Sequence, residues 1–152
     1  MLVRDIAQTD PITVTPEASL ASILHLLNRK GVRHLLVIQY GRLVGIISDR
    51  DVKSVLALSS GLEGLDHYRS ADQIMTRDPI TIAPTAPVEE AARVMLSARI
   101  SALPVVEDTR LIGIVTETDL LRILSDALRT VEPTRGSNDE ETRTSPVKQK
   151  QP

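Results

Sequence analysis

The chain has 152 residues and a formal charge of −2, and 41% of its residues are hydrophobic. It contains no Phe or Trp and only two Tyr, so it lacks the stacking aromatics and the basic face that nucleic-acid binding uses, and without cysteine it can form neither disulfides nor Cys-ligated metal sites. Its apolar runs are too short to span a bilayer and no apolar signal core opens the chain, so we expect a cytoplasmic protein with an aliphatic interior.

The strongest feature of the sequence is an internal repeat at an offset of 68 residues. The segment DPITVTP at 10–16 recurs as DPITIAP at 78–84, and RLVGIIS at 42–48 recurs as RLIGIVT at 110–116. Most other positions exchange one aliphatic residue for another. The chain therefore consists of two copies of one unit.

The first copy begins with a short extended piece at 12–14 that ends at a proline. Ser19 can then cap a helix. The aliphatic residues of this helix repeat at helical spacing: Leu20, Ile23, Leu24 and Leu27. Strands are predicted at 35–39 and 43–48, separated by a tight turn, and a second helix over about 49–58 closes the copy.

The second copy has the same order. An extended piece at 80–82 precedes Pro87, which suits the first turn of a helix. The apolar stripe of this helix consists of Val88, Ala91, Ala92 and Met95. Strands are predicted at 103–107 and 111–116, followed by a helix over about 117–128.

The order β-α-β-β-α in each copy predicts an α+β fold with two helices on one face of a short sheet. Neither unit can bury both faces of its sheet alone, so we expect the two to pack sheet to sheet around an approximate two-fold axis. The expected interior includes Leu20, Ile23, Leu24, Leu27 and Val94. Along the chain, we expect one repeat at 1–58, a linker at 59–72, the second repeat at 73–132 and a disordered polar tail at 133–152.

Both copies carry the pattern G-h-h-[S/T]-x-x-D, at 45–51 and 113–119. A Ser or Thr followed three residues later by an acid is a capping box, and for a single motif this structural interpretation is the stronger one. The alternative is a ligand site, because a helix N-terminus offers free N–H groups to a phosphate and a carboxylate can accept both ribose hydroxyls. Arg50 could add a charge-assisted bond to the phosphate. Two copies at matching positions favour the ligand site.

The segment 1–128 resembles a Bateman module, the pair of CBS domains named after cystathionine β-synthase. The resemblance rests on the DPIT openings, the strand entries at 32–35 and 100–106, and both G-h-h-[S/T]-x-x-D segments. It is similar to stand-alone bacterial CBS pairs and to the front part of acetoin-utilization proteins. The resemblance implies two clefts between the sheets, each binding an adenosine compound.

The resemblance also implies which residues line each cleft. The adenine would lie against Gln8, Ile12, Arg33 and His34 in the first cleft, and against Thr76, Ile80, Ser101 and Ala102 in the second. Ribose hydroxyls would bind Asp51, assisted by Ser48, or Asp119, assisted by Thr116. The second copy has Thr118 in place of Arg50, so it lacks that phosphate donor and the two clefts are expected to differ.

The expected function is regulatory binding of AMP, ADP, ATP or a related adenosyl ligand, acting on an unidentified protein. The alternative is a ligand-free structural dimerisation module. No catalytic residue, catalytic cofactor or metal site is predicted, since no nucleophile has a suitable partner and the three histidines lack metal-ligand spacing. A homodimer is expected because apolar residues on the helices spread too widely for one packed face. These residues are Ile23, Leu26, Leu27, Val94 and Met95.

Overall fold

Both copies of the repeat fold into the same order of elements, except that the opening strand of the second copy is a single bridge. The computed structural model describes residues 1–58 and 69–131. The first copy forms β1 (Thr13–Val14), α1 (Leu20–Lys30), β2 (His34–Gln39), β3 (Arg42–Ser48) and α2 (Asp49–Leu58). The second forms α4 (Val88–Ala98), β5 (Ala102–Glu107), β6 (Arg110–Thr116) and α5 (Glu117–Val131). The predicted α+β repeat is confirmed, and the helix predicted over 49–58 has these bounds in the structure.

The helices begin and end where local chemistry allows. The Ser19 hydroxyl accepts a hydrogen bond from the Ser22 N–H at 3.2 Å, which caps α1, and the helix ends at Gly31 in the left-handed conformation. In the second copy Pro87 is the residue before the helix, with φ −63° and ψ 146°, so it precedes the first turn rather than forming part of it as predicted. No described helix is long and apolar enough to cross a membrane.

Three short elements were not predicted from the sequence. They are η1 (Val3–Asp5), α3 (Ala71–Ile74) and β4 (Thr76–Arg77). The strand β4 extends the first sheet, whose order is β1-β2-β3-β4, whereas the second sheet contains only β5 and β6. The extended piece expected at 80–82 is reduced to a single bridge between Ile82 and Val105.

The segments that precede the two copies are exchanged between them. The Val3 N–H donates to the Ala86 carbonyl at 2.9 Å, and at the offset of 68 the Ala71 N–H donates to the Ala18 carbonyl at 2.8 Å. We therefore define the first unit as residues 9–58 with 69–77 and the second as 1–8 with 78–131. Because each unit receives the equivalent segment of the other, the two are related by an approximate two-fold axis, as expected.

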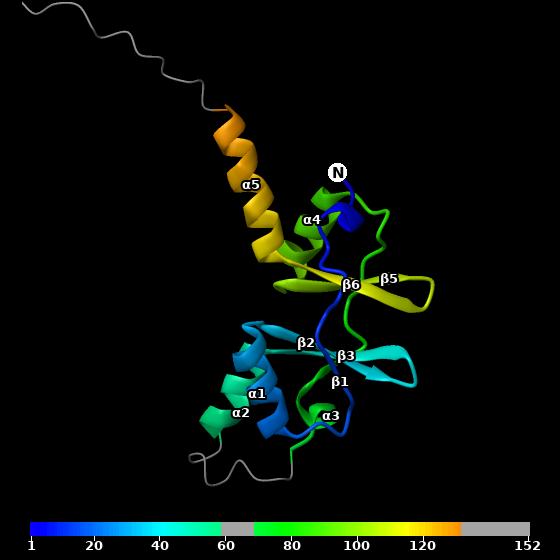
Figure 1. The fold of residues 1–152 in the computed structure, drawn as a ribbon, viewed down its shortest axis with the longest axis vertical. Coiled ribbons are helices and arrows are strands. Elements are labelled where there is room, and N and C mark those ends of the chain that lie inside the picture. The colour runs from blue at the N-terminus through cyan, green and yellow to red at the C-terminus, as the bar shows by residue number, and fades with distance from the viewer. Residues whose placement is uncertain (59–68, 132–152) are drawn as a thin grey trace, which may run out of the picture.

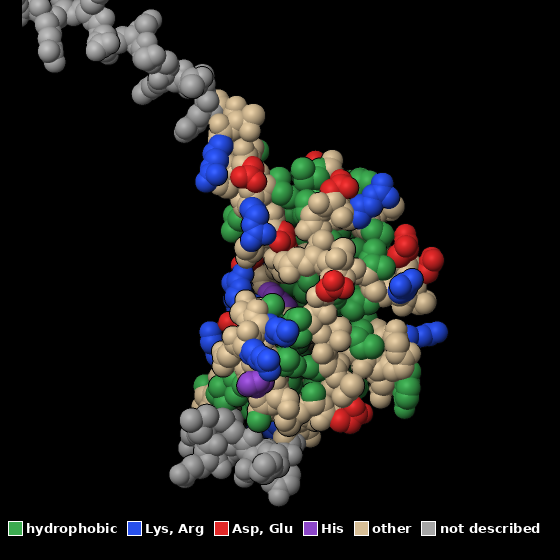
Figure 2. All heavy atoms as spheres, viewed as in Figure 1, with side chains coloured by type: hydrophobic (Ala, Val, Ile, Leu, Met, Phe, Trp, Pro, Cys, Tyr) green, Lys and Arg blue, Asp and Glu red, His purple; other side chains and the backbone are tan. Residues whose placement is uncertain are grey.

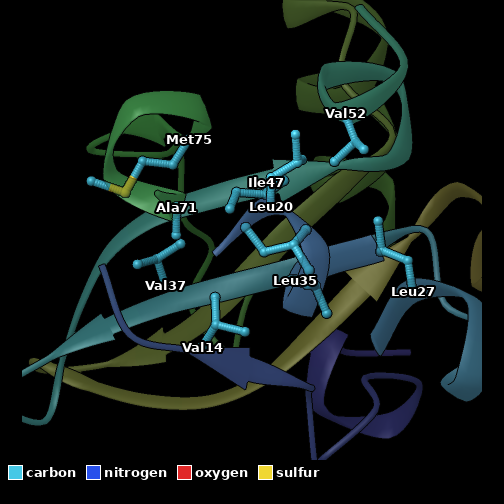
Figure 3. Close-up of a cluster of buried hydrophobic side chains, with 10 residues drawn as sticks. Val14, Leu20, Leu27, Leu35, Val37, Ile47, Val52, Ala71 and Met75 are labelled. Atoms are coloured by element: carbon cyan, nitrogen blue, oxygen red, sulfur yellow. The ribbon is translucent and has the colours of Figure 1, made fainter. Parts of the chain in front are cut away.

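Each unit has its own aliphatic core. Figure 3 shows the first, in which Ala71 and Met75 of the exchanged segment pack with Leu35 and Val37 of β2 and Ile47 of β3. Of the expected interior residues, Leu20, Ile23 and Leu27 are buried, and Leu24 and Val94 are partly buried against the cores of their own units. Burial of such side chains is the main stabilising term for the fold.

The helical residues from which a dimer was expected are used inside the units. Ile23, Leu27 and Met95 are buried, and Leu26 and Val94 pack partly buried against the same cores. That reason for a homodimer is therefore wrong. Of the nine large apolar side chains that remain exposed in the described residues, four lie on α5, which Figure 1 shows projecting beyond the second unit.

The two sheets face each other across a third apolar cluster, with the helices on the outer sides (Figure 1). Leu36 of β2, Ala102 of β5 and Ile114 of β6 are its buried members. Partly buried side chains from both units surround it: Leu43, Ile46 and Leu111. The sheet-to-sheet contact brings the two units together. Their strand-to-helix junctions, one in each unit, lie at equivalent positions.

Candidate functional site

The two G-h-h-[S/T]-x-x-D segments lie where a strand runs directly into a helix. In the first unit β3 ends at Ser48 and α2 begins at Asp49; in the second, β6 ends at Thr116 and α5 begins at Glu117. Helix N-terminal N–H groups lack partners within their own helix, and each junction presents the positive end of a helix dipole. The first N–H of each helix is already bonded, because the Asp49 N–H donates to the Arg33 carbonyl and the Glu117 N–H donates to the Ser101 carbonyl, both at 2.9 Å.

The capping box predicted for these segments is complete in the first unit, where the Asp51 N–H also donates to the Ser48 hydroxyl at 3.1 Å, and its carboxylate half is present in the second. The Ser48 backbone N–H and hydroxyl both donate to Oδ2 of Asp51 at 2.8 Å. The Thr116 backbone N–H and hydroxyl donate to Oδ2 of Asp119 at 2.8 and 2.7 Å. In each case the cap uses one carboxylate oxygen. The structural interpretation therefore does not exclude a ligand at the other.

The second carboxylate oxygen distinguishes the two units. Among the described residues none donates to Oδ1 of Asp51, and since no buried side-chain oxygen there lacks a partner, this atom is open to solvent. Oδ1 of Asp119 instead accepts from Nε2 of Gln8 at 3.2 Å and from Nη1 of Arg122 at 3.4 Å. Asp119 is only 5% exposed. Among residues 1–58 and 69–131, Oδ1 of Asp51 has no donor, whereas Oδ1 of Asp119 is already bonded.

The assignment of Gln8 to the cleft of Asp51 is wrong. Its backbone pairs with Ile114 of β6, and its side chain reaches Asp119. The cause is the exchange of the opening segments, which carries the residue to the other unit. Thr76 moves in the opposite direction and pairs with Ile46 of β3, the strand that leads to Asp51.

Arg33 crosses from the first unit to the helix N-terminus of the second. Its Nη2 donates to the Thr118 hydroxyl at 3.0 Å and lies 3.7 Å from the Glu117 carboxylate. The expected place of Arg33 in the first cleft put it with Asp51. In the structure its side chain also contacts the helix N-terminus of the second unit. It brings a guanidinium to the position where the second repeat has Thr118 in place of Arg50.

His34 joins the two units at the same boundary. Its Nε2 lies 3.1 Å from the Ser101 hydroxyl. Burial, with the neighbouring Arg33 charge, lowers the pKa of His34 below its usual value, although Asp49, Asp51 and Glu117 act in the opposite direction. A neutral imidazole at physiological pH can exchange a hydrogen bond with the serine without introducing a buried charge.

The remaining predicted residues differ in accessibility. Arg50 is exposed, and Ile80 is 49% exposed. Ile12 packs partly buried against the first core. Ala102 is 4% exposed and belongs to the cluster between the sheets, so its side chain is not free to contact a ligand.

Two of the hollows on the described part of the chain can be compared with the predicted site. One, of about 360 Å³, is lined by Pro16, Glu17, Gln39, Ser70 and Asp72 and contains no predicted site residue. The other, of about 180 Å³, is lined by Ile6, Asp119, Arg122, Ile123 and Asp126. The chemistry identifies the second as the relevant one because it contains a motif aspartate. Arg122 was missed from the sequence, although its place one turn after Asp119 was a usable signal.

Basic side chains lie near both junctions, and several pair with acids there: Arg33 with Glu117, Lys53 with Asp49 and Arg122 with Asp119. On the face shown in Figure 2, Lys and Arg side chains gather along the flank formed by α5 and the helices of the first unit. No group of three or more His, Cys, Asp or Glu in the described ranges is placed to hold a metal ion.

Comparison with known proteins gives one consistent family. The model described as "CBS domain" matches residues 3–58 and 71–126. A CBS domain-containing protein of Dictyostelium discoideum, DDB_G0289609, is 33% identical over 88% of this chain and 97% of its own length. L-aspartate semialdehyde sulfurtransferase of Methanocaldococcus jannaschii is 35% identical over 80% of this chain, which spans only 23% of that enzyme.

Solved structures extend the likeness to the fold. The CBS domain pair of protein MJ0100, in complex with 5′-methylthioadenosine and S-adenosyl-L-methionine, is 33% identical with a TM-score of 0.74 over 84% of this chain and 98% of its own. CBSX2 in complex with AMP is 30% identical, with a TM-score of 0.72 over 84% and 98%. A putative acetoin utilization protein of Vibrio cholerae is 28% identical, with a TM-score of 0.77 over 88% and 98%.

Proposed function

We propose, from the premise that this chain belongs to the CBS domain family, that it is a regulatory module that binds an adenosine ligand and acts on another protein. AMP, ADP and ATP are the proposed ligands, together with related adenosyl compounds. The structures of relatives solved with AMP, 5′-methylthioadenosine and S-adenosyl-L-methionine support this class of ligand. The proposed role is binding rather than catalysis.

The observation that carries the proposal is the carboxylate of Asp51. The capping box fixes its Oδ2 with two hydrogen bonds of 2.8 Å, and its Oδ1 has no donor in the described part of the chain. A carboxylate held in this way at a helix N-terminus can accept hydrogen bonds from a ribose diol without first losing a protein partner. The helix dipole and the exposed Arg50 side chain favour a phosphate on the same ligand.

The proposal is tested by adding adenosine compounds to the full chain. We expect AMP, ADP, ATP or 5′-methylthioadenosine to raise the melting temperature, because a ligand that binds only the folded state stabilises it. At a ligand concentration one hundred times the Kd the gain is about 2.7 kcal/mol, or several degrees for a chain of this size. Guanosine and cytidine nucleotides are the controls. If no adenosine compound shifts the melting temperature or gives heat in calorimetry at millimolar concentration, the structural dimerisation module becomes the better description.

We further propose that two copies of the chain associate through α5. This helix exposes Leu121, Leu124, Leu128 and Val131, which are 61%, 53%, 58% and 76% accessible. Their spacing places them on one side of the helix, and an apolar stripe of this kind can pack against the same stripe of a second copy around a two-fold axis. The proposed dimer is thus supported by the exposed face of α5, and not by the helical residues from which the sequence predicted it.

Light scattering is expected to give a mass of twice 16.6 kDa at micromolar concentration. Leu124→Asp with Leu128→Asp should reduce it to the monomer mass, because two buried charges in an apolar contact are strongly unfavourable. Tyr40→Asp, at a residue 95% exposed in the β2–β3 turn, is the control and should leave the dimer intact. A wild-type chain with the monomer mass would contradict the proposal.

A further inference from the structure

The two motif aspartates occupy equivalent positions but not equivalent environments. Nε2 of Gln8 lies 3.2 and 3.3 Å from the two carboxylate oxygens of Asp119, and Nη1 of Arg122 lies 3.4 Å from one of them. No described residue outside the capping box donates to Asp51. One carboxylate is therefore bridged by an amide and a guanidinium, and the other is not.

The difference comes from two positions of the repeat. At the offset of 68, Gln8 corresponds to Thr76 and Arg122 corresponds to Ser54. The backbones match, because Gln8 pairs with Ile114 as Thr76 pairs with Ile46. Thr and Ser are short, whereas Gln and Arg are long enough to reach the carboxylate of their unit. The Asp51 site therefore serves, within the same chain, as the reference for a site without the two bridging residues.

The hollow beside Asp119 is also smaller than most small-molecule sites. The hollow that Asp119 and Arg122 line measures about 180 Å³, whereas small-molecule sites usually measure at least about 300 Å³. Arg122 is largely exposed, with 70% of its side chain accessible. It can therefore turn away without disturbing the core. If Gln8 and Arg122 moved away from Asp119, one of its oxygens would become available and the hollow would become larger at the same time.

We propose that Gln8 and Arg122 form a latch that holds the Asp119 site closed, so that the Asp51 site fills first. A ligand reaches Asp119 only by displacing the Gln8 amide. Because Gln8 also pairs through its backbone with Ile114 of β6, occupation of the Asp119 site loosens the segment that leads to η1. The second binding event is thereby coupled to the N-terminal segment, and the first is not.

The latch rests on the proposed function, the binding of an adenosine ligand. It is tested on the full chain with Asp51→Ala, which leaves Asp119 as the remaining site. In this background, Gln8→Thr with Arg122→Ser gives the Asp119 site the residues found beside Asp51. Calorimetry with AMP and with 5′-methylthioadenosine should show binding about tenfold tighter than Asp51→Ala alone, since hydrogen bonds to a charged group no longer compete with the ligand. Unchanged or weaker binding would overturn the latch.

The reciprocal variants transplant the latch. In an Asp119→Ala background, Thr76→Gln with Ser54→Arg should bridge Asp51 and weaken AMP binding there by about tenfold. If the transplant leaves AMP affinity unchanged, Gln and Arg at these positions do not compete with the ligand. Far-UV circular dichroism and melting curves verify that each variant is folded before its affinity is compared.

A second readout follows the latch itself. In the Asp51→Ala protein, AMP should shift the side-chain amide resonances of Gln8 and speed hydrogen exchange at its backbone N–H; in the Asp119→Ala protein it should do neither. Identical behaviour in both proteins would overturn the latch. The proposed function fails separately, when neither the wild-type chain nor the opened variant binds any adenosine compound. The latch alone fails when wild type binds and the opened variant binds no better than its parent.

Discussion

Asp51→Ala is expected to weaken binding of AMP, ADP and ATP by at least about tenfold while the chain remains folded. The open Oδ1 of Asp51 is the acceptor proposed for the ribose. Each hydrogen bond between a ligand and a charged group contributes about 1.5–3 kcal/mol, and 1.4 kcal/mol corresponds to a tenfold change in Kd. Calorimetry of the wild-type and variant chains measures the difference directly.

The loss of affinity must be separated from the loss of the cap. Asp51 also accepts from the Ser48 N–H and hydroxyl, so its removal should cost about 1 kcal/mol of folding free energy, visible in a urea titration. A matched control is Asp49→Ala, two residues earlier in the same helix turn. Although desolvation opposes the effect, the hydrogen bond and charge of Lys53 lower the pKa of Asp49 from its ordinary value, so this neighbour is also an ionised acid of the same helix turn.

Asp49→Ala removes a carboxylate from the same helix N-terminus but should leave nucleotide affinity within about twofold, because Asp49 already pairs with Lys53 and takes no part in the capping box. Equal affinities for the wild-type, Asp49→Ala and Asp51→Ala chains would mean that the ligand binds elsewhere. A similar decrease in both variants would point to the general charge of the helix turn rather than to one carboxylate.

The elements of the fold could be predicted from the sequence because they depend on local patterns. The aliphatic spacing of α1 and the Ser19 cap define a helix without reference to the rest of the chain. The exchange of the opening segments could not be predicted in this way. The contact of Gln8 with Asp119 joins residues 111 positions apart. The hydrophobic periodicity of the sequence does not show which of the two units residues 1–8 pack against.

The site was predicted in type but not in arrangement. Placing Gln8 beside Asp51 followed the order of the chain, and the exchange reversed it. The inequality of the two sites was expected from Arg50 and Thr118. The structure adds a different cause, the bridge from Gln8 and Arg122 to Asp119. The repeat itself contained the signal, since long polar residues stand in one copy where Thr76 and Ser54 stand in the other.

The two motif glycines provide the largest expected effect on stability. A Cβ on Gly113 would lie 2.6 Å from the carbonyl oxygen of Gln8, which is backbone and is fixed by its pairing with Ile114. A Cβ on Gly45 would instead meet the side chain of Met75, which is flexible. The same substitution therefore meets a rigid obstacle in one unit and an adaptable one in the other.

Gly113→Ala is expected to lower the free energy of unfolding by about 2–3 kcal/mol, because overpacking is costly when backbone must move and because the hydrogen bonds between Gln8 and Ile114 are strained or lost. Gly45→Ala should cost less than about 1.5 kcal/mol, since Met75 can change rotamer. Urea denaturation measures both values, and hydrogen exchange at the Gln8 and Ile114 amides reports whether the N-terminal segment has left β6. Equal costs for the two glycines, or an N-terminal segment still protected in Gly113→Ala, would show that the close approach of Gln8 to β6 does not set the requirement for glycine at position 113.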